Sequence, residues 1–349
     1  MAHPLAAARS GSVPGTTRTP APAGPAAGIA AFRHGSPVRA KPPHQRRTAR
    51  PAKIAAVHSL NADLHSHSTA SDGTLTSTIL AQRAKANGVE LWALTDHDEL
   101  SGLAEARAAA DAVGLPFVDG IEISVTFAGT TVHIVGLGID PANDALVAGI
   151  AEVRAGREQR AKQMGDGLAK AGIQGAYEGA IGLAPNPNLV SRTHFGRFLI
   201  NQGIAPDMHA VFRRFLTEGK PGYVEHRWAK LGDAVRWIRA AGGVAVIAHP
   251  GRYKFTPTEE YALFTEFQAH GGEGVEVVTG SHHAGDVFKY TDMAIEFGLL
   301  ASRGSDFHDP EESRLDLGLL PGRPELSPKL TPVWSLWSQS TGRDALVAS

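Results

Sequence analysis

Two histidines separated by one residue, His65 and His67, lie in the segment DLHSHSTASDG at residues 63–73. In an extended strand, residues i and i+2 point to the same side, so both imidazoles would face one point. Asp72 adds a carboxylate a few residues later. Converging imidazole and carboxylate groups are ligands that divalent metal ions accept. The pair alone does not establish a metal site, because isolated histidines are common.

Further residues of the same types follow the other predicted strands. The motifs that contain them are LTDHDEL, GIEIS, VHIVG, AHPGRY and GSDFH, and the candidate ligands are His97, Glu122, His133, His249, Asp306 and His308. Each residue alone has a structural explanation, such as a buried histidine or a helix cap. Packing does not explain why six of seven predicted strands contain such residues toward one end. Together they predict a site with several metal ions.

Nine candidate ligands are more than one ion needs. A single site takes about four to six donors, and a catalytic ion leaves one position open for water. We therefore expect two or three ions, with Glu122 as the carboxylate that bridges two of them. Clustered divalent ions lower the pKa of a shared water and stabilise an anionic transition state. Hydrolysis of a phosphoester is the reaction that most needs these effects.

Composition restricts the metal and the compartment. The 349 residues include no cysteine, which excludes disulfides, thiolate zinc sites and cysteine nucleophiles. Ligands limited to histidine and carboxylate are compatible with Mn, Zn, Fe or Mg. No apolar run reaches the roughly 18 residues of a membrane span, and no secretory signal is recognisable. We expect a cytoplasmic enzyme; the sequence does not set its oligomeric state.

The charge is unevenly distributed along the chain. Residues 1–60 contain nine Lys or Arg and no Asp or Glu, and are rich in Ala, Pro and Gly. The remainder, residues 61–349, has 25 basic against 35 acidic residues once those nine are subtracted from 34. Such a leader buries too little apolar surface to fold, so we predict a disordered basic extension. It could contact nucleic acid weakly through its charge, although a solvated tail is the simpler interpretation.

Strands and helices alternate from residue 61 onward, which predicts parallel βαβ units and an α/β barrel of seven strands. The expected strands are Ala62–His65, Leu91–Thr95, Phe117–Ile121, Val132–Gly136, Val244–Ala248, Val275–Val278 and Leu300–Arg303. Residues 143 to about 243 contain helical patterns but no clear strand, and we interpret them as a helical insertion. The predicted organisation is a metal-hydrolase domain at 61–310 and a C-terminal extension at 311–349.

These motifs, in this order, resemble the polymerase and histidinol phosphatase (PHP) family. The resemblance covers roughly residues 61–310 and implies a distorted seven-stranded (β/α) barrel with three ions, often manganese. It also implies a metal-bound hydroxide as nucleophile, with no covalent intermediate. The implied first ligand set, which would assemble that hydroxide, is His65, His67, Glu122 and Asp306. The second would be Glu122, His133 and His249, and the third Asp72, His97 and His308.

The motif NLVSRTHFGRFLINQG and the ending AHPGRY most resemble the branch of 3′,5′-nucleotide bisphosphate phosphatases and 5′→3′ exoribonucleases. In that branch Arg192 and His194 would bind substrate phosphate, and a guanidinium offers two parallel donors to such a group. Arg197 and Arg252 are weaker candidates of the same kind. The expected substrate is a nucleotide or a short RNA.

Three alternatives remain open from the sequence. The first is histidinol-phosphate phosphatase or another small phosphomonoesterase, since the metal ligands would be shared. The second is a proofreading exonuclease acting as a free subunit, because 349 residues leave no room for a polymerase. The third, of another class, is a catalytically silent scaffold that binds nucleic acid. The complete ligand set argues against the scaffold.

Overall fold

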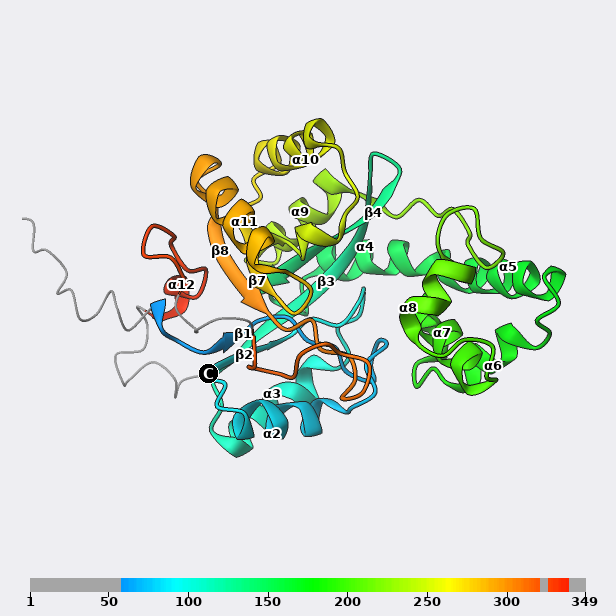
Figure 1. Cartoon of the computed structure of the whole chain (residues 1–349). Coiled ribbons are helices and arrows are strands. Elements are labelled where there is room, and N and C mark those ends of the chain that lie inside the picture. Colours follow the sequence, from blue (N-terminus) through cyan, green and yellow to red (C-terminus); the bar gives the residue numbers. More distant parts are fainter. Residues whose placement is uncertain (1–57, 321–325, 339–349) are drawn as a thin grey trace, which may run out of the picture. The chain divides into compact units, whose positions relative to one another are not determined.

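A mixed sheet curved into a nearly closed barrel forms the centre of the molecule (Figure 1). The computed structural model describes residues 58–320 and 326–338, so the predicted extension at 1–60 lies almost entirely outside the described residues. Neighbouring strands follow the order β1-β2-β3-β4-β6-β7-β8. Their bounds are β1 Ala62–Asp63, β2 Leu91–Leu94, β3 Phe117–Phe127, β4 Thr130–Leu137, β6 Val244–Ile247, β7 Gly274–Thr279 and β8 Leu300–Gly304.

Backbone hydrogen bonds connect the last strand to the first. The Leu64 N–H donates to the Arg303 carbonyl at 3.0 Å, and the Asp306 N–H donates to the His65 carbonyl at 2.8 Å. The predicted α/β barrel of seven strands is therefore confirmed. Its closure brings the loop after β8 beside the loop after β1.

The prediction of parallel units throughout was wrong at β4, which runs antiparallel to both β3 and β6. Only Ala128 and Gly129 separate β3 from β4, and both have positive φ, 46° and 76°. Two residues can form a hairpin but cannot make the crossover that a parallel pair requires. Strand β3 is also longer than predicted, so Glu122 lies in its middle rather than at its end.

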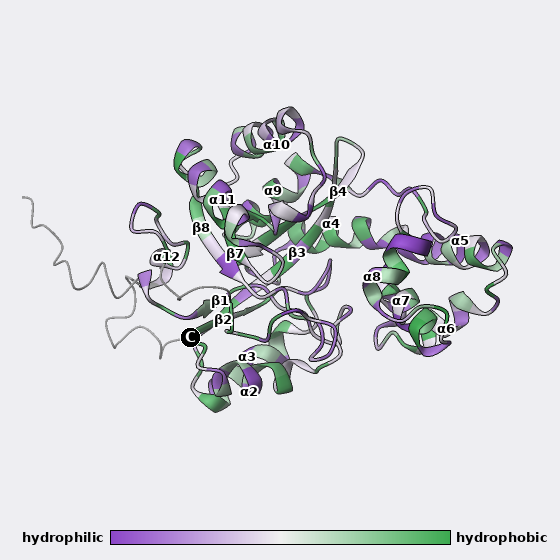
Figure 2. Cartoon of the chain, in the orientation of Figure 1, coloured by the Kyte–Doolittle hydropathy of each residue, from purple (hydrophilic) through white to green (hydrophobic). Residues whose placement is uncertain are grey.

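Helices cover the outside of the barrel: α2 (Ser77–Ala86), α3 (Leu103–Val113), α4 (Asp144–Ala155), α9 (Leu231–Ala240), α10 (Pro257–Ala269) and α11 (Ala284–Glu296). Figure 2 shows hydrophobic residues along β2 and β3 and mixed colours on the helices α2 and α11. All four residues of β2 are buried. This distribution is expected for strands covered by helices, with one apolar face on each helix.

The predicted insertion divides into two parts. Helices α4 and α9 pack on the barrel core through residues such as Ile150 and Ile238. The helices between them have a small core of their own, with Met164, Phe195 and Leu199. This inserted group comprises α5 (Arg157–Lys170), α6 (Ala176–Gly182), η1 (Pro187–Leu189), α7 (Arg192–Asn201), α8 (Met208–Val211) and η2 (Phe212–Leu216). A two-residue strand that the sequence did not predict, β5 (Ala229–Lys230), follows it and pairs with β3.

The described part of the predicted C-terminal extension packs on the barrel. Leu317, Leu330 and Trp334 are buried in the main core, and Pro332 forms a bridge with Ala301 of β8. A short helix, α12 (Ser335–Ser338), ends the described residues. None of the described helices has the length and apolar character needed to cross a membrane.

Candidate metal centre

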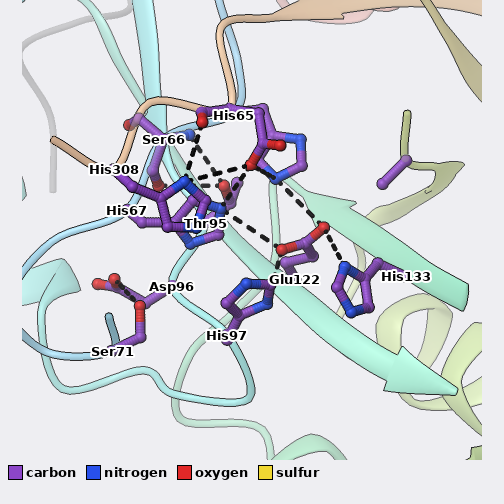
Figure 3. Close-up of polar contacts among 12 residues, drawn as sticks. His65, Ser66, His67, Ser71, Thr95, Asp96, His97, Glu122, His133 and His308 are labelled. Carbon is purple, nitrogen blue, oxygen red and sulfur yellow. Dashed lines mark hydrogen bonds and ion pairs between the residues drawn. The ribbon is translucent and has the colours of Figure 1, made fainter. Parts of the chain in front are cut away.

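Glu122 lies at the centre of the candidate ligands, in the middle of β3 and fully buried (Figure 3). Its two carboxylate oxygens face five imidazoles. Oε1 lies 3.3 Å from His65 Nε2, 2.9 Å from His133 Nδ1 and 2.9 Å from His249 Nε2; Oε2 lies 3.4 Å from His67 Nε2 and 2.7 Å from His97 Nδ1. A carboxylate with one group of imidazoles on each oxygen has the arrangement of a bridging ligand.

Two further carboxylates complete the cluster. Asp306 Oδ1 lies 3.5 Å from His65 Nε2 and 3.2 Å from His67 Nε2. Asp72 Oδ1 lies 3.9 Å from His97 Nε2 and 3.4 Å from His308 Nε2. The structure thus brings all nine predicted ligands into one continuous cluster, from six strands or the loops that follow them.

The residues present fit divalent ions. Seven buried atoms of these residues form no hydrogen bond, although five of them lie within ion-pair distance of another atom of the cluster: His65 Nε2, His67 Nδ1, Asp72 Oδ1, His97 Nδ1, Glu122 Oε2, His133 Nδ1 and His249 Nδ1. Unpaired buried polar atoms are costly and therefore rare in native proteins. Ions coordinated by these atoms would remove that cost, and nitrogen and carboxylate oxygen are suitable donors for them.

Four sets of ligand atoms lie within 4.8 Å of one another. They are His67, Asp72, His97 and His308; His65, His249 and Asp306; His65, His67 and Glu122; and His97, Glu122 and His133. The predicted third set therefore occurs as a group, with His67 added. In these sets His249 is grouped with Asp306 rather than with His133. The division into three ligand sets stays a prediction.

Three residues of the site adopt backbone conformations that are uncommon outside glycine. Asp98, His249 and Asp306 have φ values of 50°, 27° and 55°. Each follows a barrel strand, at the point where the chain turns to present a ligand or its neighbour. Such conformations cost about 1–3 kcal/mol and typically occur at functional sites, where the surrounding structure enforces them.

Glu276 is a functional candidate that the sequence interpretation missed. Its Oε1 lies 2.9 Å from His65 Nδ1, and its Oε2 accepts a 2.6 Å hydrogen bond from the His249 N–H. A carboxylate on Nδ1 leaves Nε2 of His65 to face the cluster, an arrangement common around ligated histidines. The signal was available: Glu276 is the charged residue in the strand β7, GVEVVT, and it is buried.

The carboxylates set the protonation of the cluster. Burial opposes the charged form of His97, but Glu122 and Asp72 raise its pKa to about 9. Burial likewise opposes protonation of His65, but Glu276 and Glu122 raise its pKa well above the usual value. Burial and the neighbouring histidines lower the pKa of His67 to about 3. In the metal-free cluster, protons on some imidazoles therefore provide positive charge that metal ions could replace.

A cavity of about 640 Å³ opens over the cluster. Ligand residues that line it are Asp72, His97, His133, His249 and His308. The inserted helices contribute Arg157, Arg160 and Arg192 to its wall. The cavity thus joins a cluster suited to cations with arginines suited to an anion.

The four predicted substrate residues occupy different environments. Arg192 and Arg252 line the cavity. His194 is fully buried, and its Nδ1 accepts a hydrogen bond from the Ser191 N–H as part of the cap of α7. Arg197 donates through Nε and Nη2 to Glu312, and through Nη1 to the Asp72 carbonyl. Only the first two are among the residues that line the cavity.

Arg157 and Arg160 were not selected from the sequence, although REQR places them three residues apart on one face of a helix. Arg157 pairs with Asp98, and both side chains are buried. Asp96 and Asp98 flank His97 in the motif LTDHDEL. Asp96 accepts hydrogen bonds from Ser68 and Ser71, and Asp98 accepts hydrogen bonds from Ser124.

Known proteins are similar to this chain in sequence. The PHP domain model matches residues 63–225. A 3′,5′-nucleoside bisphosphate phosphatase of Chromobacterium violaceum is 53% identical over 274 residues, which cover 78% of this chain and 95% of that protein. A 5′-3′ exoribonuclease of Haemophilus influenzae is 43% identical, covering 71% of this chain and 90% of that protein.

Two solved structures are similar to this chain in both fold and sequence. A Chromobacterium violaceum structure, described as an amidohydrolase with bound sulfate and no metal, has a TM-score of 0.76 and 51% identity, covering 80% of this chain and 96% of that one. A candidate metal-dependent phosphoesterase of Bifidobacterium adolescentis has a TM-score of 0.65 and 25% identity, covering 79% and 94%. The chain therefore belongs to the PHP domain family, in the branch of 3′,5′-nucleotide bisphosphate phosphatases and 5′→3′ exoribonucleases, and is a hydrolase of phosphoric esters.

Proposed function

We propose that this protein hydrolyses nucleotide phosphoesters at the nine-residue cluster, with divalent ions as cofactors. The substrates would be a 3′,5′-nucleoside bisphosphate, the 5′ end of short RNA, or both. Bound ions would lower the pKa of water and stabilise an anionic transition state. Glu122 would bridge two ions, while His65, His67 and Asp306 would hold one of them beside it. Manganese is the first candidate, with Zn, Fe and Mg as alternatives, and the cytoplasm is the expected compartment.

The observation that carries this proposal is a surplus of arginine in the cavity wall. Arg160 is 8% exposed, its Nε has no hydrogen-bond partner, and its guanidinium lies 5.4 Å from the centre of the Trp228 ring. Arg192 lies 5.4 Å from the centre of the Phe212 ring. Among the described residues, neither pairs with a carboxylate. Guanidinium groups stay charged, so the pair is suited to bind an anion from outside the chain.

Two phosphates on one substrate would satisfy both parts of the cavity. One phosphate would meet the metal ligands, and the other would meet Arg160 and Arg192. Relatives named a bisphosphate phosphatase and an exoribonuclease support this choice, as does the sulfate bound in a related structure. Histidinol phosphate has a single phosphate and would leave the arginines uncompensated, so it is the second candidate.

Paired substrates test the proposal. Manganese-loaded protein would receive adenosine 3′,5′-bisphosphate beside 3′-AMP, and 5′-phosphorylated beside 5′-hydroxyl short RNA. In each pair the two substrates differ by a 5′-phosphate. Charge-assisted hydrogen bonds contribute about 1.5–3 kcal/mol each, so we expect kcat/KM to be at least about tenfold higher for the substrate that carries the 5′-phosphate. Chelation should abolish turnover. Equal rates within each pair would contradict the proposed role of the arginines, and turnover of histidinol phosphate alone would favour the second candidate.

A further inference from the structure

Seven of the nine candidate ligands lie outside the strands, and Glu122 and His133 are the two within strands. Among the seven, Asp72 follows β1, His97 follows β2 and His308 follows β8, and with His67 they form one of the ligand groups. We reserve the name loop ligands for Asp72, His97 and His308. Each of these loops contacts the inserted group, at α5 or at α7 and its capping residue. On the side of the inserted group, the side chains that make these contacts are not candidate ligands.

The loop that contains Asp72 is held from α7. Ser191, which caps this helix, donates its hydroxyl hydrogen to Asp72 Oδ2 at 3.0 Å. Arg197 Nη1 donates to the Asp72 backbone carbonyl at 2.8 Å. Because Ser191 occupies Oδ2, the other oxygen, Oδ1, is directed at His97 and His308 and has no hydrogen bond of its own.

The same arginine holds the loop after β8. Arg197 forms two parallel hydrogen bonds with Glu312, from Nε to Oε1 and from Nη2 to Oε2, both at 2.9 Å. Glu312 lies four residues after His308. This paired geometry is the strong form of an ion pair. It engages the edge of the guanidinium that a phosphate would need, so Arg197 is better placed to join two loops than to bind substrate.

The loop after β2 is held from α5. Arg157 pairs with Asp98, the residue next to His97, and lies 4.6 Å from the centre of the Trp228 ring. Asp98 also accepts hydrogen bonds from the N–H and the hydroxyl of Ser124 in β3, at 2.7 Å and 2.9 Å. Its positive φ is thus enforced from two sides.

The other ligands are held by the barrel itself. Glu122 and His133 lie within β3 and β4. Glu276 contacts both His65 and the His249 backbone. The Tyr253 hydroxyl donates to the Ala248 carbonyl and accepts from the His133 N–H. The inserted helices therefore support one part of the cluster, and the barrel strands with the loops that follow them support the rest.

We propose that Ser191 and Arg197 are positioning residues for one metal position, the one formed by the loop ligands and His67, so that the inserted helices set its occupancy. This inference rests on the proposed function, because it requires the cluster to bind metal. It assigns Arg197 to the loops, whereas the sequence made this residue a weaker candidate for substrate binding. An ion at this position would depend on the docking of α7, and ions at the remaining ligands would not.

Metal binding to variants tests the inference without reference to turnover. Ser191→Ala removes the bond to Asp72, and Glu312→Gln weakens the Arg197 pair from the barrel side, away from the cavity. Stoichiometry and affinity would be measured by manganese titration and elemental analysis. Loss of an outer-sphere contact typically lowers metal affinity about 10–100-fold. We expect that loss for one of three ions in both variants, with the other two unchanged.

Matched variants provide the controls. Ser191→Thr keeps the hydroxyl and should retain all three ions, as should Glu311→Gln, which changes an exposed neighbour of Glu312. Because Ser191 also caps α7, Glu312→Gln gives the independent test with the cap intact. Three ions of normal affinity in both test variants, or equal weakening of all three, would overturn the inference. Absence of metal from the unmodified protein would instead overturn the proposed function.

Discussion

Glu276 contacts two candidate ligands through its two carboxylate oxygens, at atoms of those residues that do not face Glu122. The Oε1 atom accepts from His65 Nδ1–H, and Oε2 accepts from the His249 N–H. Both of its contacts are donors, so the position requires two acceptors. An amide of the same shape supplies only one acceptor. The negative charge also makes the His65 imidazole a stronger ligand.

The variant Glu276→Gln is therefore expected to weaken metal binding while the fold is retained. One of the two hydrogen bonds becomes a contact between two donors, and His65 Nδ1–H loses the negatively charged carboxylate beside it. We expect manganese affinity to fall about 10–100-fold, measured by titration of the chelator-treated protein. Glu273→Gln is the matched control, since Glu273 is exposed and directly precedes the same strand. Unchanged affinity in Glu276→Gln would contradict the role given to this carboxylate.

At the scale of residues, the sequence predicted which side chains would gather but not what supports them. His65 and His67 were identifiable because histidines two apart at a strand end have few structural explanations. Glu276 occurs in an apolar strand with no neighbouring motif, so nothing local connected it to His65, which is 211 residues away. The contact of Ser191 with Asp72 depends on how α7 docks, which local sequence does not encode.

At the scale of elements, β1 and β8 approach closely where the barrel closes. A Cβ on Gly304 would lie 2.3 Å from the Cβ of His65 and 2.6 Å from its backbone nitrogen. Real Cβ atoms do not approach neighbours this closely, so any larger residue must move one strand. Glycine at this position allows the first and last strands to bring their ligands together.

We expect Gly304→Ala to destabilise the protein by about 1–3 kcal/mol, the usual cost of overpacking a core. It should also weaken metal binding, because His65 would be displaced. Urea unfolding and manganese titration would measure the two effects. Gly285→Ala in α11 is the control, since a Cβ there meets nothing within 4 Å and helical alanine is favoured over glycine. Equal unfolding free energies and equal manganese affinities in the two variants would show that the close approach of Gly304 to His65 does not require glycine.

Elements were largely predictable because apolar runs and helix caps are local signals. The direction of β4 was not predictable, because the same apolar pattern occurs in strands of parallel pairs and of antiparallel pairs. The short Ala128–Gly129 turn was the signal that could have revealed the hairpin. The inserted helices were predicted as helical, but their docking against the loops of Asp72 and Glu312 depends on long-range ion pairs.

At the scale of the whole molecule, the histidines predict how stability depends on pH in the metal-free protein. His97 has a pKa of about 9, above the unfolded value of 6.5, so its contribution is present below pH 6.5 and lost as the pH rises toward 9. His67 and His249 have pKa values of about 3, so they favour unfolding as the pH falls below 6.5. Stability should therefore be highest near pH 6.5.

Urea unfolding of chelator-treated protein between pH 5 and 9 would measure this profile. Saturating manganese should shift the maximum to higher pH, because metal binding requires unprotonated imidazoles and displaces the proton of His97. Proton release on metal addition, followed in weakly buffered solution, would give a second measurement. A maximum that does not move with metal would contradict the assignment of His97 as a ligand.

Closure of the barrel has a consequence during synthesis. Asp306, which contacts both the first candidate ligand, His65, and the last, His308, reaches His65 only after β8 has paired beside β1. A nascent chain that has not yet extended past β8 lacks Asp306 and His308. We expect such a chain to lack a complete ligand cluster, and products terminated before residue 306 to lack it as well. A hydrolase of nucleotides built in this way becomes active only after β8 and the loop that follows it have been made.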